Sequence, residues 1–166
     1  GLETSSEVVS INIPAGIYDG AQLAMKGYGN AAPQGGVSGD LYIIVEVEEH
    51  KDLIRNNDDL IYNLMLPLTV AVLGDEVVIP TLEGKVKIKI KPGTQPGEVL
   101  RLRNKGVPSL NGYGRGDLLV NIGVYIPERL SSEEKEMFWA KYFNFASKFT
   151  AKTESAPASG KGTMGE

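Results

Sequence analysis

Apolar and polar positions alternate in short runs along this chain, which is the pattern of β-strands that bury one face. Valine or isoleucine occupies every second position of residues 9–13, and residues 85–91 alternate lysine with valine or isoleucine. Residues 41–47 and 118–126 are richer in β-branched side chains, and a Gly-Asp pair precedes each of them. Such runs predict more buried strands that begin after a turn.

Two copies of this pattern lie 77 residues apart, the distance from Gly16 to Gly93. Residues 11–16 read Ile-Asn-Ile-Pro-Ala-Gly, and residues 88–93 read Ile-Lys-Ile-Lys-Pro-Gly. The same spacing aligns further turns without an insertion, namely Gly20 with Gly97, Gly29 with Gly106, and Gly39-Asp40-Leu41 with Gly116-Asp117-Leu118. Matched turns and matched alternation together predict two copies of one supersecondary unit.

The second copy is preceded by a segment that the first copy lacks. Residues 59–66 predict a strand, Pro67 can begin a short helical turn, and Gly74 can end that turn in the left-handed region. Residues 76–79 predict another strand, whereas only residues 1–7 stand before the first copy. We therefore expect a fragment that was cut inside a domain, with an unpaired sheet edge in the first module.

After Pro127 the pattern becomes helical. Ser131 and Glu134 have the spacing of a capping box, and large apolar residues then recur about every 3.6 positions. These residues are Met137, Phe138, Tyr142, Phe143 and Phe149. We expect the aromatic side chains to dock on the second module, or to form a dimer contact or cover a sheet edge.

The predicted fold is all-β, with two tandem small β-sandwich-like modules related by the internal repeat and a C-terminal α-helix. Residues 150–166 lack periodicity and predict a disordered tail. The expected boundaries are 1–50 for the C-terminal part of the first module, 51–58 for a linker, 59–127 for the second module, 128–149 for the helix and 150–166 for the tail.

Composition removes several classes of function. The 166 residues include no Cys and one His, which excludes disulfides, thiolate zinc and multi-histidine metal sites. The net charge of −4, and a lysine row without interleaved aromatics, argue against nucleic-acid binding. No apolar run reaches the roughly 20 residues of a membrane span. We therefore expect no metal, cofactor, nucleic-acid partner or membrane insertion.

Candidate catalytic groups lack the partners that catalysis requires. His50 lies in a charged stretch with no serine motif in strand-turn-helix context, so we interpret it as a surface residue. The pairs Asp58-Asp59 and Asp75-Glu76 precede strands, where carboxylates satisfy turn amides. The glycine-rich residues 35–39 and 112–116 run into strands, and a phosphate loop needs a helix N-terminus. We predict no enzyme activity.

With catalytic groups excluded, apolar side chains remain as candidates for a binding surface. Four residues of the first copy, with four counterparts in the second, are expected to line one sheet beside a free edge, where an extended apolar peptide could bind. The first set is Val9, Ile11, Leu41 and Ile43, and the counterparts are Val86, Ile88, Leu118 and Val120. The alternative interpretation is that all of these residues are ordinary core.

The order of motifs in residues 8–145 resembles the C-terminal substrate-binding region of DnaJ co-chaperones. The motifs are Ile13-Pro14-Ala15-Gly16, Asp19-Gly20, Gly39-Asp40-Leu41-Tyr42, Asp59-Leu60-Ile61-Tyr62, Ala71-Val72-Leu73-Gly74, Val78-Ile79-Pro80-Thr81-Leu82-Glu83-Gly84, Pro92-Gly93-Thr94-Gln95, Gly106-Val107-Pro108 and Gly116-Asp117-Leu118-Leu119. The resemblance implies tandem β-sandwich-like modules followed by a helix that leads toward a dimerisation segment. In the zinc-containing class, the zinc domain would end just before Gly1. The resemblance therefore implies a fragment without J domain, zinc-binding domain or zinc.

The resemblance also implies a function. The family holds unfolded client polypeptides and delivers them to a DnaK-type ATPase in the cytoplasm, and it can form homodimers through the C-terminal region. The family's groove maps to Val9 and Ile43, with Ile11 and Leu41 beside them. ATPase stimulation needs a His-Pro-Asp tripeptide, and the single His here begins His50-Lys51-Asp52. The alternatives are a carbohydrate-binding β module or hydrolase, and a scaffold that serves only assembly.

Overall fold

The structure is a computed structural model that describes residues 6, 8–30 and 36–140 of the chain. It divides into two compact units, residues 1–125 and residues 126–166, and each is described by itself. The predicted tail and the part of the predicted helix after residue 140, with four of its aromatic residues, lie outside the described residues.

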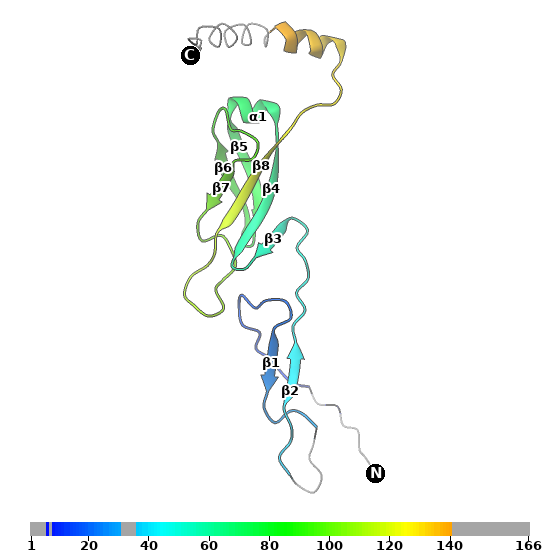
Figure 1. Cartoon of the computed structure of the whole chain (residues 1–166), viewed down its shortest axis with the longest axis vertical. Coiled ribbons are helices and arrows are strands. Elements are labelled where there is room, and N and C mark those ends of the chain that lie inside the picture. The colour runs from blue at the N-terminus through cyan, green and yellow to red at the C-terminus, as the bar shows by residue number, and fades with distance from the viewer. Residues whose placement is uncertain (1–5, 7, 31–35, 141–166) are drawn as a thin grey trace, which may run out of the picture. The chain divides into compact units, whose positions relative to one another are not determined.

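The first unit is built mainly of β-strands, in agreement with the predicted all-β class (Figure 1). Its elements, in chain order, are β1 (Gln22–Met25), β2 (Leu41–Ile44), β3 (Leu53–Asn56), β4 (Asp59–Pro67), α1 (Leu68–Leu73), β5 (Asp75–Thr81), β6 (Gly84–Ile90), β7 (Val99–Leu102) and β8 (Leu118–Tyr125).

The second module is a small β-sandwich. One sheet has the order β3-β4-β8-β7, and the other is the antiparallel hairpin β5-β6. Strands β4 and β8 are parallel from Leu60 opposite Leu118 to Pro67 opposite Tyr125. The largest fully buried side chains come from both sheets, namely Leu66, Ile79, Ile90, Leu118 and Val120. An apolar layer between two sheets is what holds a sandwich together.

The helix α1 begins and ends where the sequence predicts. Pro67 precedes it, and Gly74 follows it with φ 73°, donating its N–H to the Val70 carbonyl at 2.9 Å. A β-carbon at Gly74 would also lie 2.7 Å from the Ile90 carbonyl oxygen. Glycine is therefore required there both for its backbone conformation and for space.

The predicted repeat is confirmed by identical strand registers. Gln22 pairs with Ile44 across β1 and β2, and Val99 pairs with Asn121 across β7 and β8, 77 residues later in both strands. Gly16 and Gly93 have φ angles of 82° and 79°, so both copies turn in the left-handed region after the Ile-x-Ile segment.

The predicted Gly-Asp turns also repeat in atomic detail. A carboxylate oxygen of Asp40 accepts the Gly27 N–H at 3.1 Å, and one of Asp117 accepts the Asn104 N–H at 2.8 Å. Gly27 and Asn104 both have positive φ angles, of 80° and 57°. The aspartate thus closes the same loop in each copy.

The strand expected over residues 9–13 is wrong, because residues 8–14 form no strand. Their counterparts lie in β6, which is held by the ladder to β5. Within the described ranges, no strand lies beside residues 8–14 to supply such a ladder. The strand predicted over 41–47 is likewise shorter and ends at Ile44, whereas β8 continues to Tyr125 along its parallel neighbour β4.

The segment 51–58, expected to be a linker, contains strand β3, which pairs antiparallel with β4. Asn57 takes a positive φ of 56° in the two-residue turn between these strands. His50 directly precedes the segment, and its Nδ1 accepts the N–H groups of Asp52 and Leu53, both at 3.1 Å. The asparagine turn signal was present in the sequence, but strand β3 is too short to show alternation clearly.

In the second unit, residues 132–140 form a helix whose predicted capping box is confirmed. The Ser131 N–H donates to a Glu134 carboxylate oxygen at 2.7 Å, and the Glu134 N–H donates to the Ser131 hydroxyl at 3.2 Å. These reciprocal bonds satisfy two amides that the helix itself leaves free.

Candidate peptide-binding surface

Strand β2 presents two of the predicted groove residues on one face. Leu41 lies opposite Met25 and Ile43 lies opposite Leu23 in the ladder to β1, so alternate side chains of both strands share this face. Leu41 is 37% exposed, and Ile43 is half-buried. The structure therefore brings Leu41 and Ile43 together as predicted.

The same face is completely buried in the second module. Leu118 and Val120, the counterparts of Leu41 and Ile43, are both 0% exposed. The contrast extends to the preceding segment, since Ile13 is 60% exposed and its counterpart Ile90 is 1% exposed. The first module thus exposes side chains at positions that form the core of the second.

The other two predicted groove residues, Val9 and Ile11, lie in the segment without a strand. Val9 is half-buried and Ile11 is 42% exposed. Their counterparts on β6 pack against the core from the sheet that does not contain β8. The expectation that all four positions line one sheet is therefore wrong for the second module. There the positions form two opposed walls of one apolar space.

Strand β2 also has an open backbone edge. Its counterpart β8 is paired on both sides, with β7 antiparallel and β4 parallel. In the described part of the first module, β2 pairs with β1 alone. An open edge leaves N–H and C=O groups that another extended chain can pair with.

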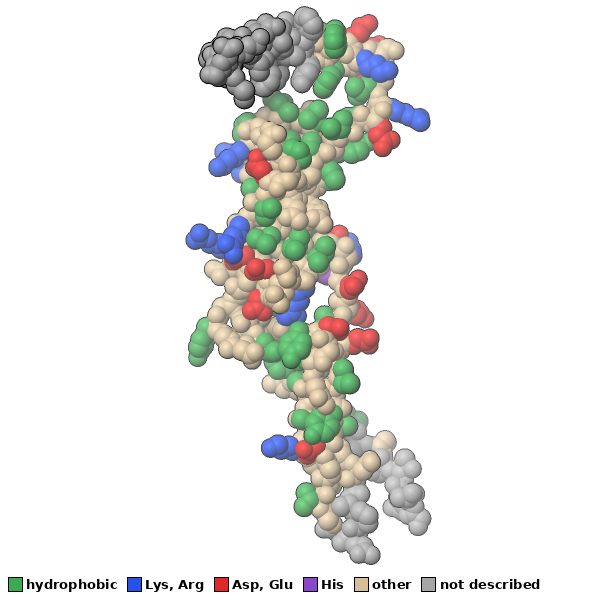
Figure 2. All heavy atoms as spheres, viewed as in Figure 1, with side chains coloured by type: hydrophobic (Ala, Val, Ile, Leu, Met, Phe, Trp, Pro, Cys, Tyr) green, Lys and Arg blue, Asp and Glu red, His purple; other side chains and the backbone are tan. Residues whose placement is uncertain are grey.

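Sequence reasoning missed the apolar residues on the opposite face of β2. Tyr42 is 59% exposed and Ile44 is 74% exposed, and hydrophobic side chains are visible at the surface of this part of the chain (Figure 2). The available signal was the run Leu-Tyr-Ile-Ile, which has no polar residue on either face.

Two of the carboxylates considered for catalysis accept hydrogen bonds from backbone amides. Asp59 accepts the Asp117 N–H at 2.7 Å, and Asp75 accepts the N–H of Glu76 at 2.7 Å. Among the residues that the structure describes, no cluster of three His, Asp or Glu side chains is arranged to hold a metal. The same residues include no helix with the length and apolar character that crossing a membrane requires.

Comparison with known proteins decides the family. The family profile described as DnaJ C terminal domain matches residues 3–127. The chain belongs to the DnaJ C-terminal domain family. Chaperone protein DnaJ of Bacteroides fragilis is 59% identical over 135 residues, which are 81% of this chain and 34% of that protein. Chaperone protein DnaJ of Porphyromonas gingivalis is 52% identical over 136 residues, 82% of this chain and 36% of that protein. The chain thus spans about a third of the length of these relatives.

In this DnaJ C-terminal domain, two acidic residues stabilise the loop region of the second module. The Asn104 N–H and the Arg101 guanidinium, 2.6 Å from the carboxylate, hold the pKa of Asp117 below its ordinary value of 3.8. Hydrogen bonds from Lys105 and Arg115 similarly lower the pKa of Glu83 from its ordinary 4.5. Both carboxylates connect segments that are distant in sequence.

The lowered pKa of Asp117 predicts acid sensitivity of the second module. Because the folded state binds this proton more weakly than the unfolded state, the stabilisation is present above pH ~4 and is lost as the pH falls through the lowered folded pKa. We expect Asp117→Asn to have a lower Tm than wild type at pH 6 and a smaller decrease of Tm between pH 6 and pH 2. Thermal unfolding followed by circular dichroism at several pH values measures this, and parallel decreases in both proteins would contradict it.

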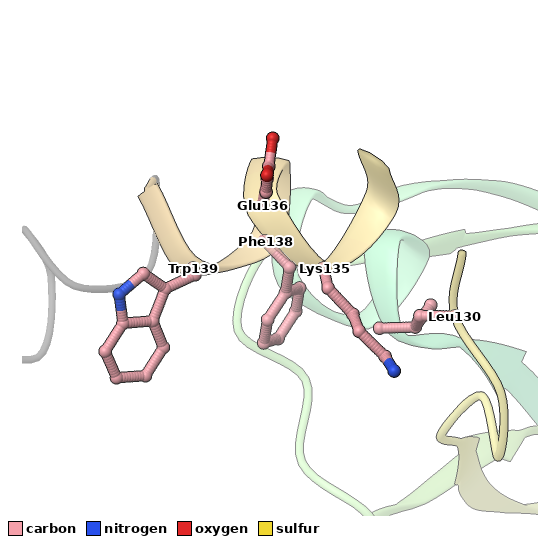
Figure 3. Close-up of a pocket in the computed structure, with 5 residues that line it drawn as sticks. All are labelled: Leu130, Lys135, Glu136, Phe138 and Trp139. Carbon is pink, nitrogen blue, oxygen red and sulfur yellow. The ribbon is translucent and has the colours of Figure 1, made fainter. Parts of the chain in front are cut away.

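The chain has a second apolar surface on its C-terminal helix. A shallow hollow there is lined by Leu130, Lys135, Glu136, Phe138 and Trp139. Phe138, Lys135 and Leu130 lie on one side of the helix, and Glu136 points to the other (Figure 3). Met137, Phe138 and Trp139 are 62%, 49% and 67% exposed. Docking of these side chains on the second module, or on another copy, stays a prediction.

Proposed function

We propose that this chain binds exposed apolar segments of unfolded client polypeptides, as the substrate-binding part of a DnaJ co-chaperone that delivers clients to a DnaK-type ATPase. The observation that carries the proposal is the exposure of Leu41, 37%, where its repeat counterpart Leu118 is 0% exposed. Family membership supports the proposal, because the relatives are named as DnaJ chaperones. Delivery to DnaK, a cytoplasmic location and homodimer formation are proposed for the whole protein.

The proposed site combines backbone pairing with side-chain burial. An extended client segment would pair with the open edge of β2 and place alternate side chains against Leu41 and Ile43 on one side and Val9 and Ile11 on the other. Backbone pairing tolerates most client sequences, since it uses main-chain groups that every residue except proline carries in full. The apolar walls would then select segments that are buried in folded proteins and exposed in unfolded ones.

The expected affinity is modest. Each fully buried aliphatic or aromatic client side chain contributes about 1.5–3 kcal/mol, and ordering the extended client costs about 1–2 kcal/mol per residue. Two or three buried side chains therefore give micromolar affinity or weaker. A weakly held client can pass to the next chaperone by dissociation, so the function is binding at equilibrium and needs no catalytic group.

Substitution of Ile43 tests the groove directly. We expect Ile43→Asp to weaken binding of a fluorescent apolar peptide at least about tenfold, because a carboxylate cannot be buried against an apolar side chain. Ile44→Asp is the matched control, since the same change falls on the opposite face of the same strand. Fluorescence anisotropy with the whole chain measures both affinities.

The proposal is contradicted if the two variants bind the peptide equally well, or if neither the wild type nor the controls bind it. Concentration-dependent oligomers without any peptide affinity, seen by sedimentation, would favour the assembly scaffold. A carbohydrate-binding module would bind a sugar array and would not bind the apolar peptide. Val9→Asp repeats the test on the other wall of the proposed site.

A further inference from the structure

A single arginine connects the two modules. Arg55 lies on β3 of the second module, and its guanidinium donates to the carbonyl oxygens of Gly16 and Ile17 in the first module, both at 2.6 Å. Its Nε donates to the carbonyl of Asn57 at 2.7 Å, which fixes the plane of the guanidinium group. Three donors in one rigid plane therefore hold two turns together, one from each module.

Gly16 provides a second, independent contact at the same place. A β-carbon on Gly16 would lie 2.0 Å from the Pro108 carbonyl oxygen and 3.3 Å from the Leu110 nitrogen. The repeat counterpart Gly93 has nearly the same φ, 79° against 82°, but nothing lies within 4 Å of its β-carbon position. The turn at Gly16 therefore has a requirement beyond its backbone conformation, which is close packing on the loop of the second module.

The geometry points to a joint, made by Arg55 on one side of the Gly16 turn and the Pro108 loop on the other, that fixes the orientation of the first module relative to the second. Both modules belong to one compact unit, residues 1–125. Among the described residues 8–30 and 36–47 of the first module, Ala21 is the one buried apolar residue, at 6% exposure. One small side chain does not form an apolar core with the second module, so such a core does not set the orientation. The joint does not depend on the proposed function.

The joint explains why β3 has an arginine at a half-buried position, while its apolar neighbour Ile54 is 54% exposed. The Arg55 guanidinium donates to backbone carbonyls that lie 38 and 39 residues earlier in the sequence. Lysine has one compact ammonium group and cannot reproduce three coplanar donors. An arginine is therefore the residue type that this geometry requires, and a side chain of similar length without donors should release the turn.

Residual dipolar couplings of backbone amides in the whole chain test the joint. We expect one alignment tensor to fit the amides of both modules in the wild type and two different tensors in Arg55→Met. Arg101→Met is the control, because Arg101 lies on the same sheet and pairs with Asp117 within the second module. Its couplings should still fit one tensor.

The two repeat glycines give a matched pair that does not depend on Arg55. Gly16→Ala and Gly93→Ala carry the same backbone strain, but only the first places a β-carbon against the other module. We expect two tensors for Gly16→Ala and one for Gly93→Ala. If the amide resonances of the first module lose their dispersion in Arg55→Met, that variant has unfolded the module, and the comparison of Gly16→Ala with Gly93→Ala then tests the joint. Two tensors in the wild type, or one tensor in Gly16→Ala with an unchanged orientation, would overturn the joint.

Discussion

Leu118→Ala is expected to lower the free energy of unfolding of the second module by about 2–5 kcal/mol, which is the usual cost of a cavity at a fully buried leucine. Leu118 is 0% exposed and lies in the apolar layer between the two sheets. The matched substitution Leu41→Ala, 77 residues earlier, removes a side chain that is 37% exposed. We expect it to cost less than about 1 kcal/mol.

Urea unfolding, followed by far-ultraviolet circular dichroism, measures both free energies in the whole chain. Similar losses for Leu118→Ala and Leu41→Ala would contradict the structure, since they would show that Leu41 is a core residue like its counterpart. That result would also remove the support for a peptide-binding surface on β2. A large difference agrees with a face that is covered in one module and open in the other.

Gly116→Ala is expected to destabilise the second module by about 3 kcal/mol or more, because the added β-carbon has no space. Its position lies 2.0 Å from the Asp58 carbonyl oxygen and 2.8 Å from the Asp59 nitrogen. These are backbone atoms at the start of β4, which is a central strand of the sheet, so relief of the clash must displace the strand.

Gly112→Ala in the same loop is the control for this substitution. Its added β-carbon would meet only the Ser109 hydroxyl oxygen at 3.4 Å and the Ser109 β-carbon at 3.9 Å. We expect a change within about 0.5 kcal/mol. Thermal unfolding by calorimetry separates the two variants, and an equal Tm for both would show that β4 and the loop do not approach as the structure places them.

Much of the fold could be predicted because its determinants are local and occur twice. The turns after Ile13 and Ile90 need a left-handed glycine, and the loops closed by Asp40 and Asp117 need the Gly-Asp pair, so both are visible in sequence. The capping box at Ser131 is local in the same way. Each of these elements was predicted from spacing alone.

Other features depend on partners that sequence does not show. Residues 9–13 have strand alternation, but a strand needs a hydrogen-bonded neighbour, and the ladder that β5 gives β6 has no described equivalent here. The pairing of β3 with β4 is set by a two-residue turn. The bonds from Arg55 to Gly16 and Ile17 span 39 and 38 residues, and no periodicity reports such a contact.

The candidate surface was predicted only in part for the same reason. Alternation placed Leu41 and Ile43 on one face of a strand, which the ladder to β1 confirms. Whether such a face is core or open depends on what covers it, and identical alternation at Leu118 and Val120 leads to complete burial. Exposure is a property of the tertiary structure, so the repeat alone could not distinguish the two copies.

The most direct test is a heteronuclear NMR titration of the whole chain with an apolar peptide. The account predicts that amide resonances of β2, residues 41–44, shift on binding and that their hydrogen exchange slows, while the counterpart residues 118–121 of β8 stay unchanged. Shifts confined to β8 or to the helix at residues 132–140, or no shift at peptide concentrations in the millimolar range, would contradict the account.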